Sequence, residues 1–252
     1  MNTKTPYYQF CKLATEDVET YKSFKRNDIY NIYMEHVTMQ QGVGYIKEIE
    51  KIINKYTLDI NFDLLIKNDM IGLPRNYHYK INGVHVNVSP TTLRFIKQGL
   101  DILIHIKKTK DMIGDVNIVE IGGGYGGLCY ILHVLSLSMD VKINKYVMYD
   151  SFWPLVLQHN YLDEIKQHLD YNPNVEFNEY TDDLDVGLNY YLVSNFTLSE
   201  LNTSLQNKLI SAIKAKHGYL TWSDYTLPLF STFQVVVDEL PQTGVYNKTI
   251  TF

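Results

Sequence analysis

The chain has few cysteines and no long apolar run. Its 252 residues contain two cysteines, Cys11 and Cys129, too few and too far apart for a disulfide framework or a zinc site. The longest apolar stretch covers 128–139 and is interrupted by polar side chains, whereas a membrane span needs roughly 20 residues. No apolar segment follows the amino terminus, so no secretory signal is expected. We therefore expect a protein of the reducing cytoplasm that has no membrane partner.

Positive charge is also scarce. The chain has 23 basic and 28 acidic residues, which gives a net charge of −5, and three of the basic residues are arginines, namely Arg26, Arg75 and Arg94. Proteins that bind a phosphate backbone usually present a basic face. The composition therefore argues against a nucleic-acid partner.

The first 75 residues or so have helical periodicity. Apolar residues recur near a 3.6-residue period over 10–34, which predicts one helix. A second helix is predicted over 43–56, with Gly42 and Gly44 breaking the chain before it. These helices form the start of an amino-terminal region that the sequence leaves without an assigned role.

A hairpin and a long helix are predicted next. Strand-forming residues lie on both sides of Asn82-Gly83, the strongest short signal for a type I′ hairpin, within 76–88. Ser89 is followed by a proline, which predicts the N-cap and first position of a helix over 90–108. Alternate hairpin residues face alike, so we expect one apolar face and one polar face.

From residue 115 onward strands and helices alternate. The predicted strands cover 117–121, 145–149, 175–177, 190–194 and 218–222, and the helices between them cover 128–137, 154–169 and 199–214. Such alternation predicts an α/β fold with a mainly parallel sheet and helices on both faces. Two final strands, over 233–238 and 245–252, predict a closing antiparallel pair after five βα units.

The strongest chemical signal is a glycine loop after the first of these strands. Five of the six residues from Gly122 to Gly127 are glycines. The spacing fits G-x-G-x-x-G, which indicates a dinucleotide, and equally E-x-G-x-G-x-G, which begins at Glu120. Glycines at a strand-to-helix turn let the backbone approach a ligand that any Cβ would exclude.

The residues around the loop favour S-adenosylmethionine over a dinucleotide. A carboxylate at Glu120 repels a pyrophosphate but can face a cationic sulfonium or amino group. Asp150 ends the second strand, where it can accept hydrogen bonds from both ribose hydroxyls, although sites for NAD share this feature. The closing strand pair is not usual in a dinucleotide-binding fold.

The segment from Asn117 to the end resembles the class I S-adenosylmethionine-dependent methyltransferases. It is most similar to the sugar O-methyltransferase family in three motifs, EIGGGYGG, YDSFWPLVLQHNYL and YYLVSNFTLSEL, and upstream in SPTTLR. The resemblance implies a Rossmann-like seven-stranded sheet with an amino-terminal helical and hairpin extension. The cofactor-binding residues it implies are Glu120, Gly122, Gly123, Gly124, Tyr125, Gly126, Asp150, Ser151, Phe152, Asp182 and Asn195.

The fourth strand of the methyltransferase segment leads to the expected acceptor side. Methyltransferases that act on planar amino groups tend to have Asn-Pro-Pro-aromatic here, whereas this chain has Asn195 without a following proline. A hydroxyl acceptor needs a base within hydrogen-bond reach. Glu200 is the first candidate, His85 on the polar face of the hairpin the second, and Asp224 the third. Asn195, Glu200 and Asp224 are too sparse a set to assign a metal.

The sequence thus predicts a methyltransferase domain over 110–252 preceded by an acceptor-side cap over 1–109. We expect the hairpin of this cap to fold over the carboxyl ends of the sheet and help close the acceptor pocket. The predicted function is O-methylation of a hydroxyl on a nucleotide sugar or glycan precursor. Two alternatives stay open: a nicotinamide-dependent oxidoreductase, and a catalytically inactive methyltransferase-like subunit that binds a partner. The sequence also leaves open whether the chain forms a homo-oligomer.

Overall fold

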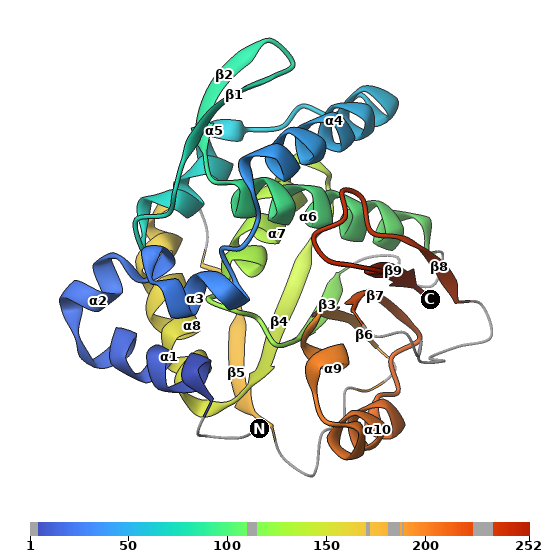
Figure 1. Ribbon diagram of the computed structural model, residues 1–252. Coiled ribbons are helices and arrows are strands. Elements are labelled where there is room, and N and C mark those ends of the chain that lie inside the picture. Colours follow the sequence, from blue (N-terminus) through green and yellow to red (C-terminus); the bar gives the residue numbers. More distant parts are fainter. Residues whose placement is uncertain (1–4, 110–114, 170–171, 181–186, 188, 224–233) are drawn as a thin grey trace.

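A seven-stranded sheet forms the centre of the computed structural model, which describes residues 5–109, 115–169, 172–180, 187, 189–223 and 234–252 (Figure 1). Its strands are β3 (Val116–Ile121), β4 (Ile143–Asp150), β5 (Val175–Glu179), β6 (Tyr190–Asn195), β7 (His217–Trp222), β8 (Val235–Asp238) and β9 (Lys248–Thr251). The order is β5-β4-β3-β6-β7-β9-β8; the first five are parallel, and β9 pairs antiparallel with both β7 and β8. This is the class I methyltransferase arrangement, so the predicted fold class is confirmed.

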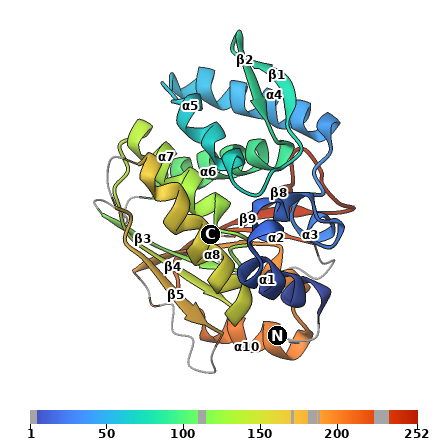
Figure 2. The ribbon, with the colours of Figure 1, turned by 90° about the vertical axis from the view of Figure 1, so that its left-hand side faces the viewer.

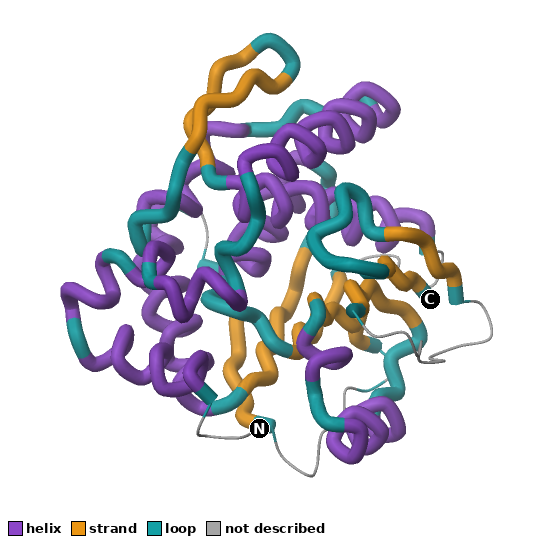
Figure 3. Tube along the Cα trace, viewed as in Figure 1, coloured by secondary structure: helices purple, strands orange, loops and turns teal. Residues whose placement is uncertain are grey.

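Helices lie on both faces of this sheet (Figure 3). They are α1 (Pro6–Glu16), α2 (Val18–Lys22), α3 (Asp28–Tyr33), α4 (Met39–Tyr56), α5 (Phe62–Leu65), α6 (Pro90–Lys108), α7 (Gly127–Ser138), α8 (Phe152–Ile165), α9 (Thr197–Glu200) and α10 (Thr203–Ala212). Successive strand residues pack on opposite faces. Ile118 belongs to the larger core with α6, α7 and α8, and Val119 to the smaller core, which includes Leu209 of α10.

The larger core also includes the amino-terminal helices. Phe10 of α1, Tyr30 of α3 and Ile49 of α4 belong to the same buried cluster as Ile118 of β3. Helix α1 packs along α8, and α2 and α3 lie beside them (Figure 2). The proposed boundary between 1–109 and 110–252 therefore does not coincide with a gap in the core.

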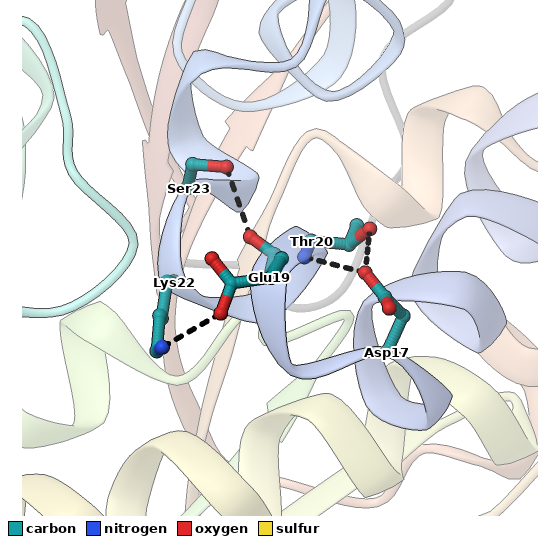
Figure 4. Close-up of polar contacts among 5 residues, drawn as sticks. All are labelled: Asp17, Glu19, Thr20, Lys22 and Ser23. Carbon is teal, nitrogen blue, oxygen red and sulfur yellow. Dashed lines mark hydrogen bonds and ion pairs between the residues drawn. The ribbon is translucent and has the colours of Figure 1, made fainter.

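The single helix predicted over 10–34 is wrong, because polar caps divide this segment. Asp17 lies between α1 and α2, and its Oδ2 accepts hydrogen bonds from the backbone N–H of Thr20 (2.7 Å) and from the Thr20 hydroxyl (2.6 Å) (Figure 4). Asn27 caps α3 in the same way through the N–H of Ile29. Such side chains satisfy the first N–H groups of a new helix, so apolar periodicity alone missed two breaks.

Helix α4 begins earlier than predicted, and its glycines lie inside it. Thr38 and Gln41 form a capping box at its start. A Cβ at Gly42 would lie 2.3 Å from the Tyr79 hydroxyl oxygen, and one at Gly44 would lie 3.0 Å from Pro241. The glycines therefore allow close packing of α4 against other segments and do not break the chain.

The predicted hairpin is confirmed. Strands β1 (Tyr77–Ile81) and β2 (Val84–Val88) pair around Asn82-Gly83, both of which have positive φ. Tyr79, Ile81 and the inward valines of β2 are buried, so one face is apolar as expected. However, this face packs against α4, and the hairpin projects from the fold (Figure 1). The expectation that the hairpin closes over the carboxyl ends of the sheet is therefore wrong.

The helix boundaries of the second half are mostly as predicted, with one division. Ser89 Oγ accepts from the N–H of Thr92 and caps α6 at its predicted start. The helix predicted over 199–214 is two helices, α9 and α10, because Asn202 Oδ1 accepts from the N–H of Leu205 and begins a new helix. Within the described ranges, no helix is long and apolar enough to cross a membrane.

A buried polar cluster joins the amino-terminal region to the glycine loop. Asn68 has no exposed surface, and its Nδ2 donates to the hydroxyls of Tyr125 and Thr92. Its Oδ1 accepts from the Tyr161 hydroxyl, and its backbone carbonyl accepts from the Lys25 ammonium at 2.7 Å. One asparagine thus satisfies side chains from the loop, α6, α8 and the amino-terminal region.

We predict that Asn68→Leu lowers the free energy of unfolding by about 3 kcal/mol or more, since it leaves buried tyrosine hydroxyls without a partner. Chemical denaturation measures this loss. Asn54→Leu, at an exposed position of α4, is the matched control and should change stability by less than about 0.5 kcal/mol. Equal losses in the two variants would contradict the role assigned to this cluster.

Candidate cofactor and acceptor site

The glycine loop lies between the end of β3 and the start of α7. Gly122, Gly124 and Gly126 have positive φ values of 79°, 59° and 94°, a backbone region that favours glycine. Because β3 is the middle one of the five parallel strands, with β4 on one side and β6 on the other, the loop meets the carboxyl ends of both neighbours. Ligands of open α/β sheets bind at such a position.

The side chain of Tyr125 points away from the loop surface. It is fully buried, its ring contacts those of Phe24, Phe95 and Tyr161, and the Lys25 ammonium lies 4.1 Å from its centroid. Burial lowers the pKa of Lys25 to about 8. Tyr125 therefore anchors the loop to the amino-terminal core, so only its backbone is available to a cofactor.

Glu120 is buried at the end of β3. It is 2% exposed, and its Oε2 accepts a hydrogen bond from the Tyr146 hydroxyl at 2.8 Å. Burial raises the pKa of Glu120 to about 8, and the nearby Asp150 carboxyl raises it further, while the Tyr146 hydrogen bond lowers it. The loop lies directly over this acid, since a Cβ at Gly123 would be 3.2 Å from Glu120 Oε2.

Asp150 is equally buried at the end of β4. Its Oδ1 accepts from the N–H of Ser151 at 2.7 Å, and its Oδ2 accepts from Gln158 Nε2 at 3.0 Å. Gln158 Nε2 also donates to the carbonyl of Gly124, so one amide joins the acid to the loop. Burial raises the pKa of Asp150 to about 7, against the lowering effect of these hydrogen bonds and of one from Gly123.

These two acids form a pair without a cation. Among the described groups that shift the pKa of Glu120 or Asp150, none is positively charged. A cationic group placed beside them would favour the ionised form of both. The geometry is therefore suited to a ligand that carries positive charge next to hydroxyl donors.

Side chains from α9 and from the end of α3 cover the loop. A Cβ at Gly122 would lie 1.8 Å from Thr197 Oγ1, and one at Gly124 would lie 2.2 Å from Met34 Cε. The loop backbone thus packs directly against α9 and the end of α3.

The hydroxyl of Tyr180, which follows β5, is shielded from water and makes no hydrogen bond within the described residues. The Asp150 charge raises its pKa in addition to burial, so this hydroxyl lies near the acid pair.

The remaining predicted cofactor residues are at the edges of this region. Ser151 precedes α8, and Phe152 is 45% exposed with its ring against Trp153. Asn195 ends β6; its Oδ1 accepts from the Thr221 hydroxyl, and its Nδ2 is buried with no hydrogen-bond partner among the described residues. Asp182, predicted at the adenine amine, lies outside the described residues.

The three candidate bases differ in their placement. Glu200 ends α9, beyond the carboxyl end of β6; desolvation raises its pKa, and the Arg94 guanidinium lowers it. His85 is exposed on the outer face of the hairpin, opposite Lys80, so its assignment as second candidate is wrong. His85 is exposed because the apolar face of the hairpin packs on α4 and leaves the opposite face, which carries His85, in solvent. Asp224 lies outside the described residues.

Sequence reasoning missed the roles of Arg94, Gln158 and Met34. Arg94 is 3% exposed on α6, among apolar residues that face the core, and an arginine on such a face is itself a signal. Gln158 is two turns along α8 from Asp150, a spacing that helical periodicity brings to the same side. Met34 follows a short helix whose end could not be predicted, so no pattern pointed to it.

Two surface pockets lie away from the glycine loop. One, of about 210 Å³, is lined by residues of α7, α8 and β5, including His133 and Phe177. The other, of about 320 Å³, lies between the ends of α4 and α6 and is lined by Lys55 and Lys108. No residue of the glycine loop lines either pocket.

Comparison with known proteins agrees with the fold. No protein-family model matches the chain, and no curated protein matches it. Among solved structures it is similar to an rRNA methyltransferase from Streptomyces viridochromogenes, with a TM-score of 0.42, 12% identity and coverage of 62% of this chain and 83% of that one. It is also similar to a 16S rRNA methylase, with a TM-score of 0.43 and 8% identity; the match covers 85% of this chain and 74% of that one. An O-methyltransferase family protein from Burkholderia thailandensis gives a TM-score of 0.34 and 10% identity; the match covers 50% of this chain and 38% of that one. These distant likenesses assign neither a cofactor nor a substrate.

The raised pKa of Glu120 leads to a prediction about stability. The unfolded chain releases this proton near pH 4.5, whereas the folded protein keeps it to about pH 8, so rising pH favours unfolding over this interval. Glu120→Gln removes the titration and keeps an oxygen that accepts from Tyr146. From pH 5 to pH 8, the free energy of unfolding should fall by roughly 2–4 kcal/mol more in the native chain than in Glu120→Gln.

Denaturant melts at several pH values measure this difference. Glu16→Gln, at an exposed position of α1, is the control and should follow the native pH profile. Parallel profiles for the native chain and Glu120→Gln would contradict a protonated Glu120.

Proposed function

We propose that the chain is an S-adenosylmethionine-dependent methyltransferase. The observation that carries this proposal is a glycine loop flanked by two buried acids, Glu120 and Asp150, with no described cation beside them. Bound there, the cofactor would supply an electrophilic methyl group on a positively charged sulfonium. The sheet topology supports the same proposal, because this loop follows the middle one of the five parallel strands.

The residues present fit that cofactor. Asp150 accepts from the Ser151 N–H, the Gly123 N–H and Gln158, and from the Ser151 hydroxyl at the long distance of 3.5 Å, a weak bond that a ribose hydroxyl would replace. Glu120 would face the positively charged methionine end. Gln158 Oε1 and the Tyr180 hydroxyl are buried polar atoms without a described partner, and polar ligand groups would satisfy them.

A nicotinamide dinucleotide fits less well. Its pyrophosphate would lie against the loop, where an ionised Glu120 or Asp150 would repel it and where no described cation lowers the pKa of either acid. The dinucleotide alternative therefore requires both acids to stay protonated. Binding of NAD in place of S-adenosylhomocysteine, measured by calorimetry, would establish that alternative.

We further propose that the acceptor is a sugar hydroxyl, on a nucleotide sugar or a glycan precursor. The motif resemblance favours a sugar. A buried donor without a described partner near the acceptor side supports it, because a sugar hydroxyl would accept from it. This donor is Asn195 Nδ2, which the fold places there, at the end of β6.

In this proposal Glu200 takes the proton from the acceptor hydroxyl. An alcohol is a weak nucleophile until its proton is removed, and a base with a raised pKa performs this better near neutral pH. The wall of Thr197, Met34 and the loop would hold the reacting hydroxyl in line with the methyl group. Such positioning supplies much of the acceleration of a displacement reaction.

We predict that Asp150→Asn weakens the affinity for S-adenosylhomocysteine about 10- to 100-fold, because it replaces charge-assisted hydrogen bonds by neutral ones. Isothermal titration calorimetry measures the change. Asp163→Asn, in the exposed part of α8 where Asp163 pairs with Lys166, is the control and should bind normally. Unchanged affinity in Asp150→Asn would refute its role at the ribose.

We predict that Glu200→Gln lowers turnover about 10²- to 10⁴-fold while S-adenosylhomocysteine binding is retained. Transfer from labelled cofactor across a panel of sugar nucleotides measures turnover. In the native chain the rate should rise with pH through the raised pKa of Glu200, because only the ionised carboxylate accepts the proton, and the variant should lose this rise.

His85→Ala is the matched control and should keep near-native turnover, since His85 is in solvent. If Glu200→Gln also keeps it, Asp224 becomes the base to test. A native chain that binds S-adenosylhomocysteine but shows no turnover with any acceptor would favour the inactive-subunit alternative.

A further inference from the structure

Arg94 is a buried cation beside the proposed transfer site. Its side chain leaves α6 among core residues and is 3% exposed. It lies within electrostatic reach of three elements, because the guanidinium lowers the pKa of Glu35 before α4, of Tyr45 on α4 and of Glu200 at the end of α9. It therefore lies where the amino-terminal region meets the carboxyl end of β6.

The guanidinium is not hydrogen-bonded to an anion in the described part of the chain. One amino group donates to the Met34 carbonyl at 3.1 Å, and the other lies 3.3 Å from Nε2 of His36, which accepts as a neutral ring. The Nε–H is buried without a described partner. A guanidinium has five N–H groups, so donors of Arg94, the Nε–H among them, remain for an anion such as a carboxylate or phosphate.

Glu35 and Glu200 are the described acids whose pKa Arg94 lowers, and within the described residues neither is hydrogen-bonded to its guanidinium. Burial raises the pKa of Glu35 to about 7; Lys25, Thr91 and Arg94 lower it, and Asp69 raises it. Asp69 is engaged with Ser89 and Thr92. A buried cation that is not fully paired is costly, and an anionic ligand would offset that cost.

Some of the residues next to Arg94 are at the surface. His36 and Glu200 are exposed and Glu35 is half-buried, whereas Arg94 itself is 3% exposed. Met34 contributes to both sides of this arrangement: its carbonyl holds Arg94, and its methyl group contacts the loop at Gly124. A ligand group held by Arg94 would therefore lie next to the position from which the methyl group is transferred.

We propose that the acceptor carries an anionic group, a carboxylate or a phosphate, and that the Arg94 guanidinium binds it. This inference rests on the proposed function and narrows it, because it excludes neutral sugars as the preferred acceptors. A uronic acid would supply the carboxylate, and a sugar phosphate or nucleotide sugar would supply the phosphate. Both present the paired oxygens that match a guanidinium.

The test measures discrimination between charged and neutral sugars. The full chain, saturated with S-adenosylhomocysteine, is titrated with glucuronate, glucose 1-phosphate and neutral methyl glucoside. We expect one of the charged probes to bind about 10- to 100-fold more tightly than methyl glucoside. Preference for glucuronate identifies the carboxylate source, and preference for glucose 1-phosphate identifies the phosphate source.

Variants assign the preference to Arg94. Arg94→Gln should abolish it, and Arg94→Lys, which keeps a cation but not the paired geometry, should reduce it. Arg75→Gln removes an exposed arginine before β1 and should leave it unchanged. Arg94→Lys also serves if Arg94→Gln does not fold, because full preference in that variant would contradict guanidinium binding.

Two results would overturn the inference: no preference for either charged probe in the native chain, or a preference that Arg94→Gln retains. S-adenosylhomocysteine affinity is measured in the same samples and separates this failure from failure of the proposed function. Normal S-adenosylhomocysteine binding without charge preference refutes the role of Arg94 alone. Absent S-adenosylhomocysteine binding refutes the methyltransferase function.

Discussion

A loop built of glycines has no side chains with which to fix its own shape, so its conformation depends on what holds it from outside. Here the holding contact is Tyr125, whose ring is buried among aromatic residues and whose hydroxyl accepts from Asn68. On the opposite side the Gln158 amide binds the carbonyl of Gly124 and the carboxylate of Asp150. These contacts therefore fix the conformation of the loop backbone before any ligand binds.

Electrostatics divide the proposed site into two halves. The cofactor half contains Glu120 and Asp150, whose raised pKa values reflect burial without a described cation. The acceptor half contains Arg94, whose hydrogen-bond partners are a carbonyl and a neutral imidazole. Within the described residues, neither the two acids nor Arg94 is hydrogen-bonded to an oppositely charged side chain, and the buried charges of the two halves have opposite sign. Opposite charge preferences would favour correct placement of a cationic donor and an anionic acceptor.

The sequence predicted those features that depend on local chemistry. The Asn82-Gly83 turn, the Ser89 cap and the strand–helix alternation were found because each has a short-range physical cause. Asp17 and Asn202 divided predicted helices because a cap is easily overlooked within a periodic segment. The orientation of Tyr125 and the surroundings of Arg94 could not be predicted, since both depend on residues far away in the chain. The predicted position of the hairpin was wrong for the same reason, because it depends on packing against α4.

The continuous core has a consequence for how such chains can be recombined. Exchanging residues 1–109 for the equivalent part of another protein would replace Lys25, Asn68 and Arg94 while leaving Tyr125 and Tyr161 behind. The exchanged piece would have to bring matching partners for both tyrosines, or the glycine loop would lose its support. The amino-terminal region of this chain is thus not a detachable module, and exchanging it requires co-transfer of the residues that hold the loop.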